Sequence, residues 1–388
     1  MFVIALAYLA FVSLALPPSM LGVVWPSMRL SFGQPLSAVG LVPPVGVLAG
    51  LVSTTLAPYI VRRIGVGRIL AIGTFGSVAG LALSAASTSM WQFLGSVVLG
   101  GLSAGAVDTT LNVFAARTFG PRRINLMHAS YGLGAAASPL IVTAVIVSGL
   151  SWRWSYLIII GLQLVVAVTF SATWRRWDVP VPEAATTASS RTGRVWGADA
   201  VLGLVLAAVQ NGIEAAVAIW AFTYLTALGV STALAGGLAS GYWLTLVAGR
   251  VAFGSLAERI GAWKVMGIAV GLLLAAAVLA NLELPVPAMA AVLLFGVAAA
   301  PMYPLLVLTT ADRTSPEVAD RVIGFQAAAS SIGNAITPGL IGLTIGVHLR
   351  SFSISVTALC VLAALLLLVM HHRVRSRAHP RQRARTAG

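Results

Sequence analysis

The sequence predicts an all-α integral membrane protein with twelve transmembrane helices in two pseudo-symmetric halves of six. Of its 388 residues, 59% are hydrophobic and only 9% are charged, whereas soluble domains average about 25% charged residues. Apolar runs of the roughly 20 residues that a bilayer span requires recur along the whole chain. This composition excludes a soluble fold.

Twelve apolar runs separated by polar gaps are the basis of the prediction. They cover residues 2–27, 37–61, 69–87, 91–117, 124–148, 154–174, 199–228, 232–256, 265–283, 286–311, 322–347 and 352–370. The first run lacks the basic flank and the small-residue cleavage site of a signal peptide, so we expect it to be retained as a span.

The long polar segment between the sixth and seventh runs divides the chain. Residues 175–198 contain two prolines and many Ala, Thr and Ser residues, a composition typical of a flexible linker. We therefore expect an N-terminal six-helix half at 1–174, a cytoplasmic linker, a C-terminal six-helix half at 199–370 and a basic cytoplasmic tail at 371–388.

The basic residues lie almost entirely on one set of loops. With twelve spans, the loops on one side and the tail hold twenty Lys and Arg residues, and the opposite loops hold only Arg29, Arg153 and Arg350. Such an excess marks cytoplasmic loops. We expect a bacterial plasma (inner) membrane protein with both termini in the cytoplasm. Because the charges follow the loops and the tail, the net charge of +14 indicates contact with lipid and not with nucleic acid.

A short motif repeats after the second span of each half. Residues 58–68 read PYIVRRIGVGR and residues 254–264 read GSLAERIGAWK, with Arg-Ile-Gly beginning at Arg63 and again at Arg259. Matching basic loops at a fixed offset indicate an internal duplication.

Residues 100–134 place polar groups in two successive apolar runs. Asp108 and Asn112 are four residues apart and share a helical face, and His128 and Tyr131 follow in the next run. A carboxylate at membrane depth is costly and therefore indicates function. We expect two antiparallel helices to present these groups to one cavity, where His128 either relays protons or contacts the solute.

The seventh span supplies a second acidic residue at membrane depth. Glu214 shares a face with Gln210, four residues earlier, and Asn211 is adjacent in sequence. A carboxylate is ionised where water reaches it and neutral where it is sealed from water. We therefore expect Asp108 and Glu214 to carry protons and, with the amides, to bond solute hydroxyls. The alternative is that both acids only join helices through neighbouring Asn side chains.

Other polar and aromatic residues are candidates for the same cavity. Trp220 and Trp243 are candidate plates for the C–H face of a sugar ring, although aromatic residues also anchor helices at membrane interfaces. Gln326 and Asn334, with a serine between them, form a polar stripe that lines either a cavity or a helix contact. We expect Arg250 to reach the interface or an acid at the cytoplasmic end, with contact to an anionic solute as the alternative.

Several motifs resemble a known family of transporters. G-S-L-A-E-R-I-G-x-x-K at 254–264 resembles the signature loop of the major facilitator superfamily. Within that superfamily, G-x-x-D-x-x-x-N at 105–112 and R-x-N-L-x-H-x-x-Y-G-x-G at 123–134 are similar to the fucose–proton symporter family. Further similar motifs are N-G-x-E at 211–214, G-R-V at 249–251, P-M-Y-P at 301–304 and G-F-Q at 324–326.

The resemblance implies the major facilitator fold and a proton-linked transporter of hexoses or related small solutes. We expect a monomer that moves protons together with a hexose-like or other small polar solute, with no cofactor, no bound metal and no enzymatic activity. The alternative is a proton-driven efflux antiporter for amphipathic compounds. Two further alternatives are an intramembrane hydrolase that uses Asp108, His128 and Ser130, and a non-transporting sensor. No feature of the sequence supports an exposed nucleophile with an oxyanion hole.

Overall fold

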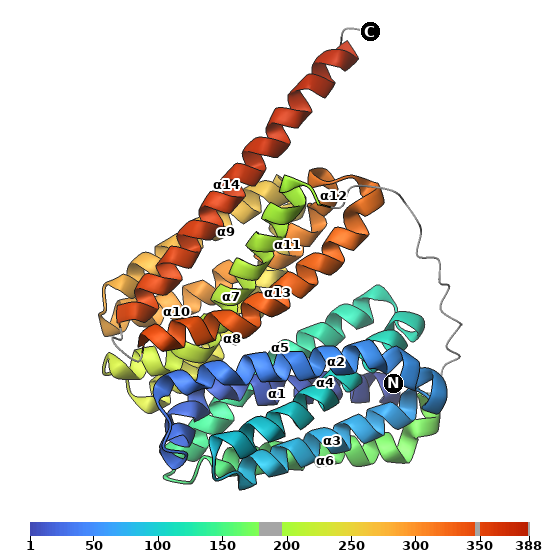
Figure 1. Ribbon diagram of the computed structural model, residues 1–388, viewed down its shortest axis with the longest axis vertical. Helices are drawn as coiled ribbons and strands as arrows, with labels where there is room; N and C mark the ends of the chain where they lie inside the picture. Colours follow the sequence, from blue (N-terminus) through green and yellow to red (C-terminus); the bar gives the residue numbers. More distant parts are fainter. Residues whose placement is uncertain (178–195, 346–349, 387–388) are drawn as a thin grey trace. The chain divides into compact units, whose positions relative to one another are not determined.

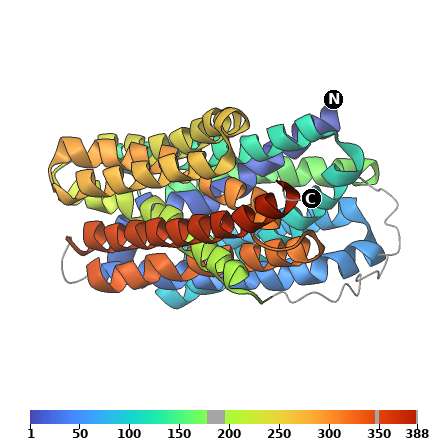
Figure 2. The same cartoon turned by 90° about the horizontal axis from the view of Figure 1, so that it is seen from above.

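The computed structural model describes residues 1–177, 196–345 and 350–386 (Figures 1 and 2). Within these ranges the chain is helical and contains no strand, which confirms the all-α prediction. Most of the predicted linker, residues 178–195, lies outside the described part.

Six long helices make up the N-terminal part of the chain. They are α1 (Phe2–Ser31), α2 (Val42–Ile64), α3 (Val66–Ala86), α4 (Met90–Thr118), α5 (Pro121–Val147) and α6 (Arg153–Thr173), with short 3-10 helices η1 (Leu36–Leu41) before α2 and η2 (Trp174–Arg176) after α6. Local chemistry sets several of the boundaries. Gly65 adopts a φ of +87° between α2 and α3, which a residue without a Cβ tolerates. The Ser89 side chain caps α4 by accepting a hydrogen bond from the Gln92 N–H.

The C-terminal part contains five long helices and one span that is broken into shorter helices. They are α7 (Ala198–Ala227), α8 (Thr232–Ile260), α9 (Ala262–Asn281), α10 (Pro285–Ala299), α11 (Met302–Leu308), α12 (Thr310–Arg313), α13 (Pro316–Ile345) and α14 (Arg350–Thr386). The predicted tenth span is the broken one, because Pro301 and Pro304 each lack an N–H for the helical ladder. Helix α14 extends to Thr386 as one long helix and so includes residues 371–386 of the predicted tail (Figures 1 and 2).

Eleven helical segments of the described chain are long and apolar enough to cross a membrane. They correspond to eleven of the twelve predicted spans, so the chain is a multi-pass membrane protein. The remaining predicted span, residues 232–256, corresponds to α8, which has 29 residues but is not among these eleven segments. Its sequence contains Arg250 and many Gly, Ser and Thr residues, and these lower its hydropathy.

The chain divides into two compact units. The first unit comprises Met1–Thr186 and Ala221–Leu244, and the second comprises Thr187–Trp220 and Thr245–Gly388. The ends of α7 and α8 that flank their connecting loop therefore group with the first unit.

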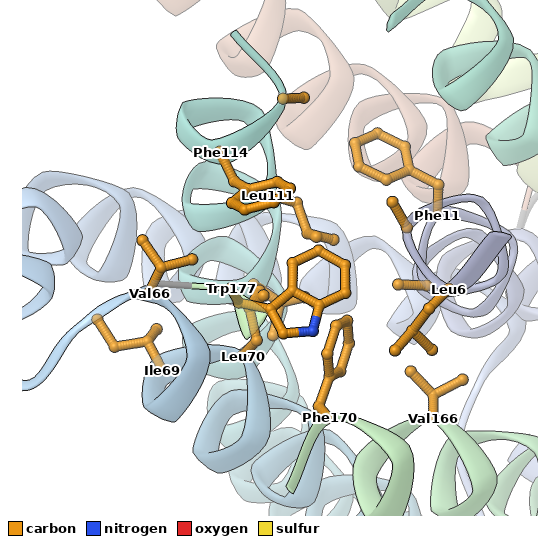
Figure 3. Close-up of a cluster of buried hydrophobic side chains, with 14 of the residues drawn as sticks. Leu6, Phe11, Val66, Ile69, Leu70, Leu111, Phe114, Val166, Phe170 and Trp177 are labelled. Carbon is orange, nitrogen blue, oxygen red and sulfur yellow. The ribbon is translucent and has the colours of Figure 1, made fainter. Parts of the chain in front are cut away.

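The apolar core of the first unit extends beyond the sixth predicted span. Figure 3 shows the Trp177 indole among Leu70 of α3, Phe114 of α4 and Phe170 of α6. Its ring lies 4.8 Å from that of Phe114 and 5.0 Å from that of Phe170, centroid to centroid. Trp177 is fully buried, so the folded part of this unit includes residues that we had expected in the linker.

Small residues allow close contacts between helices in both units. In the first unit, a Cβ added at Gly101 or Gly105 of α4 would lie 2.6 Å from the backbone carbonyl oxygen of Gly46 or Gly50 of α2. In the second unit, Gly333 of α13 lies directly against the Ala208 carbonyl of α7. Such contacts are typical of helix packing in membranes, where van der Waals fit replaces the hydrophobic effect.

Candidate functional site

Asp108 and Asn112 form a hydrogen-bonded pair on α4. The Asn112 Nδ2 donates to the Asp108 side chain at 3.2 Å and to the Asp108 backbone carbonyl at 2.9 Å. Asp108 is exposed and Asn112 is half-buried. The structure thus confirms that the two residues share a helical face, and the amide restrains the carboxylate.

His128 of α5 belongs to the same group. The imidazole is close enough to the Asp108 carboxylate for an electrostatic interaction, and its ring contacts Phe11 of α1 edge-on at 5.2 Å. Both His128 and Tyr131 are exposed. The neighbouring Ser130 is buried and donates to the Tyr8 carbonyl of α1 at 3.1 Å. One face of α5 therefore packs on α1, while His128 and Tyr131 remain accessible.

Glu214 of α7 pairs with Arg250 of α8 in the second unit. Arg250 Nη2 lies 4.0 Å from Glu214 Oε1, and the two side chains are 52% and 19% exposed. We had expected Arg250 to reach the interface or an acid at the cytoplasmic end. The structure instead gives it a partner near the middle of α7, so the second acid, like the first, is accompanied by a basic side chain.

Gln210 is buried and bonds to a helix end. Its Nε2 donates to the Ala299 carbonyl at 3.1 Å, and its side chain is 1% exposed. Ala299 is the last residue of α10, and the last carbonyls of a helix have no partner within that helix. Gln210 therefore supplies a hydrogen-bond donor to a carbonyl of the broken span. We had expected its side chain to face an accessible space, and it does not.

Asn211 joins two helices. Its Nδ2 donates to the Ala207 carbonyl of its own helix at 3.1 Å and to Ser330 Oγ of α13 at 3.0 Å. This geometry favours the alternative of a helix-joining amide over that of a solute ligand.

The predicted polar stripe on α13 splits between two environments. Gln326 and Ser330 are buried, whereas Asn334 is exposed. Positions four apart drift by about 40° around a helix, so Asn334 is rotated by about 80° from Gln326. Of these three side chains, only that of Asn334 is accessible.

Gln326 instead belongs to a buried cluster around Arg313, one of the basic residues that we expected in the cytoplasmic loops. Gln326 Oε1 accepts a 3.2 Å hydrogen bond from Thr310 Oγ1. Arg313 is 2% exposed and donates to the Thr309 carbonyl and to Thr310 Oγ1. Burial lowers the pKa of Arg313 to about 10, and the nearby Asp199 and Asp312 oppose this shift. The proline break before α11 was the one sequence signal for this cluster.

The two tryptophan candidates differ in their surroundings. Trp220 is 1% exposed, and its Nε1 donates to the Pro338 carbonyl at 2.9 Å. Trp243 is half-buried and makes an edge contact with Tyr242 at 5.4 Å. Trp220 is thus a helix-joining residue, and Trp243 keeps an accessible ring.

No three His, Cys, Asp or Glu side chains gather closely enough to hold a metal ion within the described ranges. The polar groups that the structure does bring together are a carboxylate, an amide and an imidazole in the first unit, and a carboxylate and a guanidinium in the second. These groups can bind protons, hydroxyls and anions.

Comparison with known proteins identifies relatives of the whole chain. The model of the Major Facilitator Superfamily matches residues 7–279 and 200–387. No curated protein matches the sequence.

Three solved structures illustrate the likeness in fold. The nucleoside transporter NupG is 14% identical with a TM-score of 0.73, and 95% of this chain and 97% of that chain are covered. A D-xylose-proton symporter is 16% identical with a TM-score of 0.73, and 95% of this chain and 96% of that chain are covered. The peptide transporter POT in complex with sulfate is 14% identical with a TM-score of 0.75, and 95% of this chain and 94% of that chain are covered. At such identities the likeness shows the fold alone.

Proposed function

This chain belongs to the Major Facilitator Superfamily, and from that premise we propose that it is a proton-coupled symporter of a hexose-like or other small polar solute. The observation that carries the proposal is the environment of the two acids. Asp108 is paired with Asn112 and lies near His128, and Glu214 is paired with Arg250. One of the similar folds is a D-xylose-proton symporter, which agrees with such an activity.

The cost of charge inside a membrane explains why these acids suit proton transport. An ionised carboxylate is tolerated where water or a counter-charge reaches it, and it is costly where hydrocarbon surrounds it. A site that opens alternately to the two sides of the membrane would ionise Asp108 when open and favour its neutral form when closed. Solute binding and proton binding would then be coupled through the same side chains.

We assign the solute contacts to the accessible residues of the candidate set. These are Asp108, Asn112, His128, Tyr131, Glu214, Trp243 and Asn334. The buried Gln210, Trp220 and Gln326 and the half-buried Asn211 hold the surrounding helices in place. We further propose that the protein is a monomer in the bacterial inner membrane with both termini in the cytoplasm.

Reconstituted vesicles test the symport directly. A solute gradient imposed across proteoliposomes should drive protons in the direction of the solute, reported by a pH-sensitive dye in the lumen. Asp108→Asn and Glu214→Gln should each abolish solute-driven proton movement. Asp312→Asn and Glu283→Gln make the same changes at two other acids and should leave it intact.

The direction of proton movement separates the two transport hypotheses. Protons that move against the solute would identify an efflux antiporter. Solute uptake without any proton movement, or full coupling in the double variant Asp108→Asn/Glu214→Gln, would refute the proposed symport.

A further inference from the structure

The ion pair between Arg250 and Glu214 leaves the guanidinium with unused donors. The 4.0 Å separation of Arg250 Nη2 and Glu214 Oε1 is too long for a hydrogen bond. No other ion pair or hydrogen bond of the Arg250 side chain is found among the described residues. A guanidinium has five N–H donors in a planar fork that matches the two oxygens of a carboxylate. Since 52% of this side chain is exposed, a second acceptor can reach it.

The pairing of Arg250 with Glu214 indicates a site within the span and not at the membrane surface. Helices α7 and α8 are joined by the short loop 228–231. Counted from this loop at about 1.5 Å per residue, Glu214 lies about 20 Å along α7 and Arg250 about 27 Å along α8. A snorkelling side chain would extend away from the loop, toward the other end of α8. The pairing with Glu214 instead directs the guanidinium back toward the middle of the span.

Charge balance then decides which kind of solute fits. In the empty site, the Glu214 carboxylate balances the Arg250 guanidinium. When Glu214 takes up a proton, Arg250 loses its counter-charge, and an unpaired charge inside a membrane is costly. A neutral sugar would leave this positive charge unbalanced. A solute carboxylate would balance it, so the loaded site would be as neutral as the empty one.

We propose that Arg250 binds a carboxylate of the transported solute, which is therefore a small organic anion such as a sugar acid or hydroxy acid. Glu214 is the internal anion that accompanies the guanidinium until the solute arrives, and the transported proton then resides on the Glu214 carboxylate. This inference rests on the proposed proton symport and narrows its solute class from polar to anionic.

Matched pairs of solutes test the proposal. Thermal unfolding of the purified full-length protein in detergent is measured with D-glucose and D-glucuronate, D-galactose and D-galacturonate, D-sorbitol and D-gluconate, and propane-1,2-diol and lactate. Each pair differs only by a hydroxymethyl or carboxylate group, and the ionic strength is kept constant. We expect at least one carboxylate to raise the unfolding temperature while its neutral partner does not.

Variants then locate the binding group. Arg250→Gln should weaken binding of that carboxylate on the order of tenfold to hundredfold, because a charge-assisted hydrogen bond is lost. Glu214→Gln should retain binding of that carboxylate, because the amide can still hydrogen-bond the solute while the negative charge that competes for Arg250 is gone. A merely structural ion pair would weaken binding in both variants alike. Arg350→Gln, which breaks the 2.8 Å pair with Glu283, is the matched control and should bind normally.

Three outcomes of the carboxylate-binding measurements would overturn the inference. They are stabilisation by a neutral partner equal to that by its acid, the absence of any stabilising carboxylate, and unchanged carboxylate binding in Arg250→Gln. Titration with phosphatidylglycerol tests whether a lipid headgroup is the natural acceptor for Arg250. If this lipid alone stabilises the protein through Arg250, the solute assignment is wrong.

The same measurements separate this inference from the proposed symport. Carboxylate binding that requires Arg250 but moves no protons would refute the symport and leave the anion site standing. Proton-coupled uptake of a neutral sugar would support the symport and refute the anion site.

Discussion

Trp220 of α7 donates a 2.9 Å hydrogen bond from Nε1 to the backbone carbonyl of Pro338 in α13. Pro338 has no N–H, so the carbonyl of Asn334, one turn earlier, lacks its usual helical partner. The buried indole therefore joins α7 to α13 at the turn where α13 lacks one of its backbone hydrogen bonds. A residue that we had expected to stack on a sugar ring instead fixes the helix that carries Asn334.

Trp220→Phe should destabilise the protein without changing solute affinity. The substitution retains most of the ring packing but leaves the Pro338 carbonyl without its indole donor, at a cost of about 1–2 kcal/mol. We expect a lower unfolding temperature in detergent and an unchanged KM for uptake. Trp243→Phe is the control, since that ring is accessible and its change should affect KM more than stability. The opposite pattern would restore Trp220 as a solute contact.

Gly101→Ala should loosen the contact between α4 and α2, while Gly100→Ala should not. A Cβ at Gly101 would lie 2.6 Å from the Gly46 carbonyl oxygen and 2.9 Å from the Ala49 Cβ, whereas a Cβ at Gly100 meets no atom within 4 Å. Overpacking of this kind costs about 1–3 kcal/mol. Thermal unfolding of the two variants measures the difference. Equal unfolding temperatures would show that the two helices do not approach as described.

Gly203→Ala should disturb the buried cluster around Arg313. The added methyl group would fall on Arg313 Nη1 and lie 2.9 Å from Gln326 Nε2, and a buried guanidinium forced from its acceptors is strongly destabilising. Gly271→Ala on α9 adds the same group in open space and should be neutral or slightly stabilising, because alanine favours a helix. Expression yield and unfolding temperature together check this. A stable Gly203→Ala variant would contradict the packing of Arg313.

Asn334→Ala should impair transport while leaving stability unchanged. The Asn334 side chain is exposed on α13, so its removal leaves no buried group unsatisfied. Loss of one solute hydrogen bond should raise KM about threefold to tenfold. Gln210→Ala is the contrasting variant, because its loss should lower the unfolding temperature by removing the 3.1 Å bond to the Ala299 carbonyl. A fall in stability for Asn334→Ala would show that this amide is structural.

Apart from α14, which runs on to Thr386, the predicted spans agree with the helices of the structure to within several residues. Composition and the lengths of the apolar runs are local properties, and burial in hydrocarbon requires each run to satisfy its own backbone as a helix. The pairing of Asp108 with Asn112 was equally predictable, because residues four apart share a helical face whatever surrounds them. The break in the tenth span has an equally local cause, because Pro301 and Pro304 each lack the N–H of a helical residue.

The sequence did not predict in the same way which face of each helix is buried and which is accessible. Gln210, Gln326 and Trp220 lie in apolar runs and look as suitable for a solute as Asn334 does. Nearly all faces of a membrane helix are apolar, so the sequence contains little contrast between faces that pack and faces that are accessible. Only the neighbouring helices showed that these three side chains are buried and bonded to backbone or hydroxyl groups.

The sequence by itself determined the helical membrane fold, the approximate spans and the presence of one acid at membrane depth in each predicted half. It did so because hydrocarbon imposes helix formation and penalises charge residue by residue. Only the tertiary structure decided that Arg250 accompanies Glu214, that His128 lies near Asp108 and that Trp177 completes the core of the first unit. Those relationships join residues of different helices, and contacts of that kind depend on packing that no local pattern encodes.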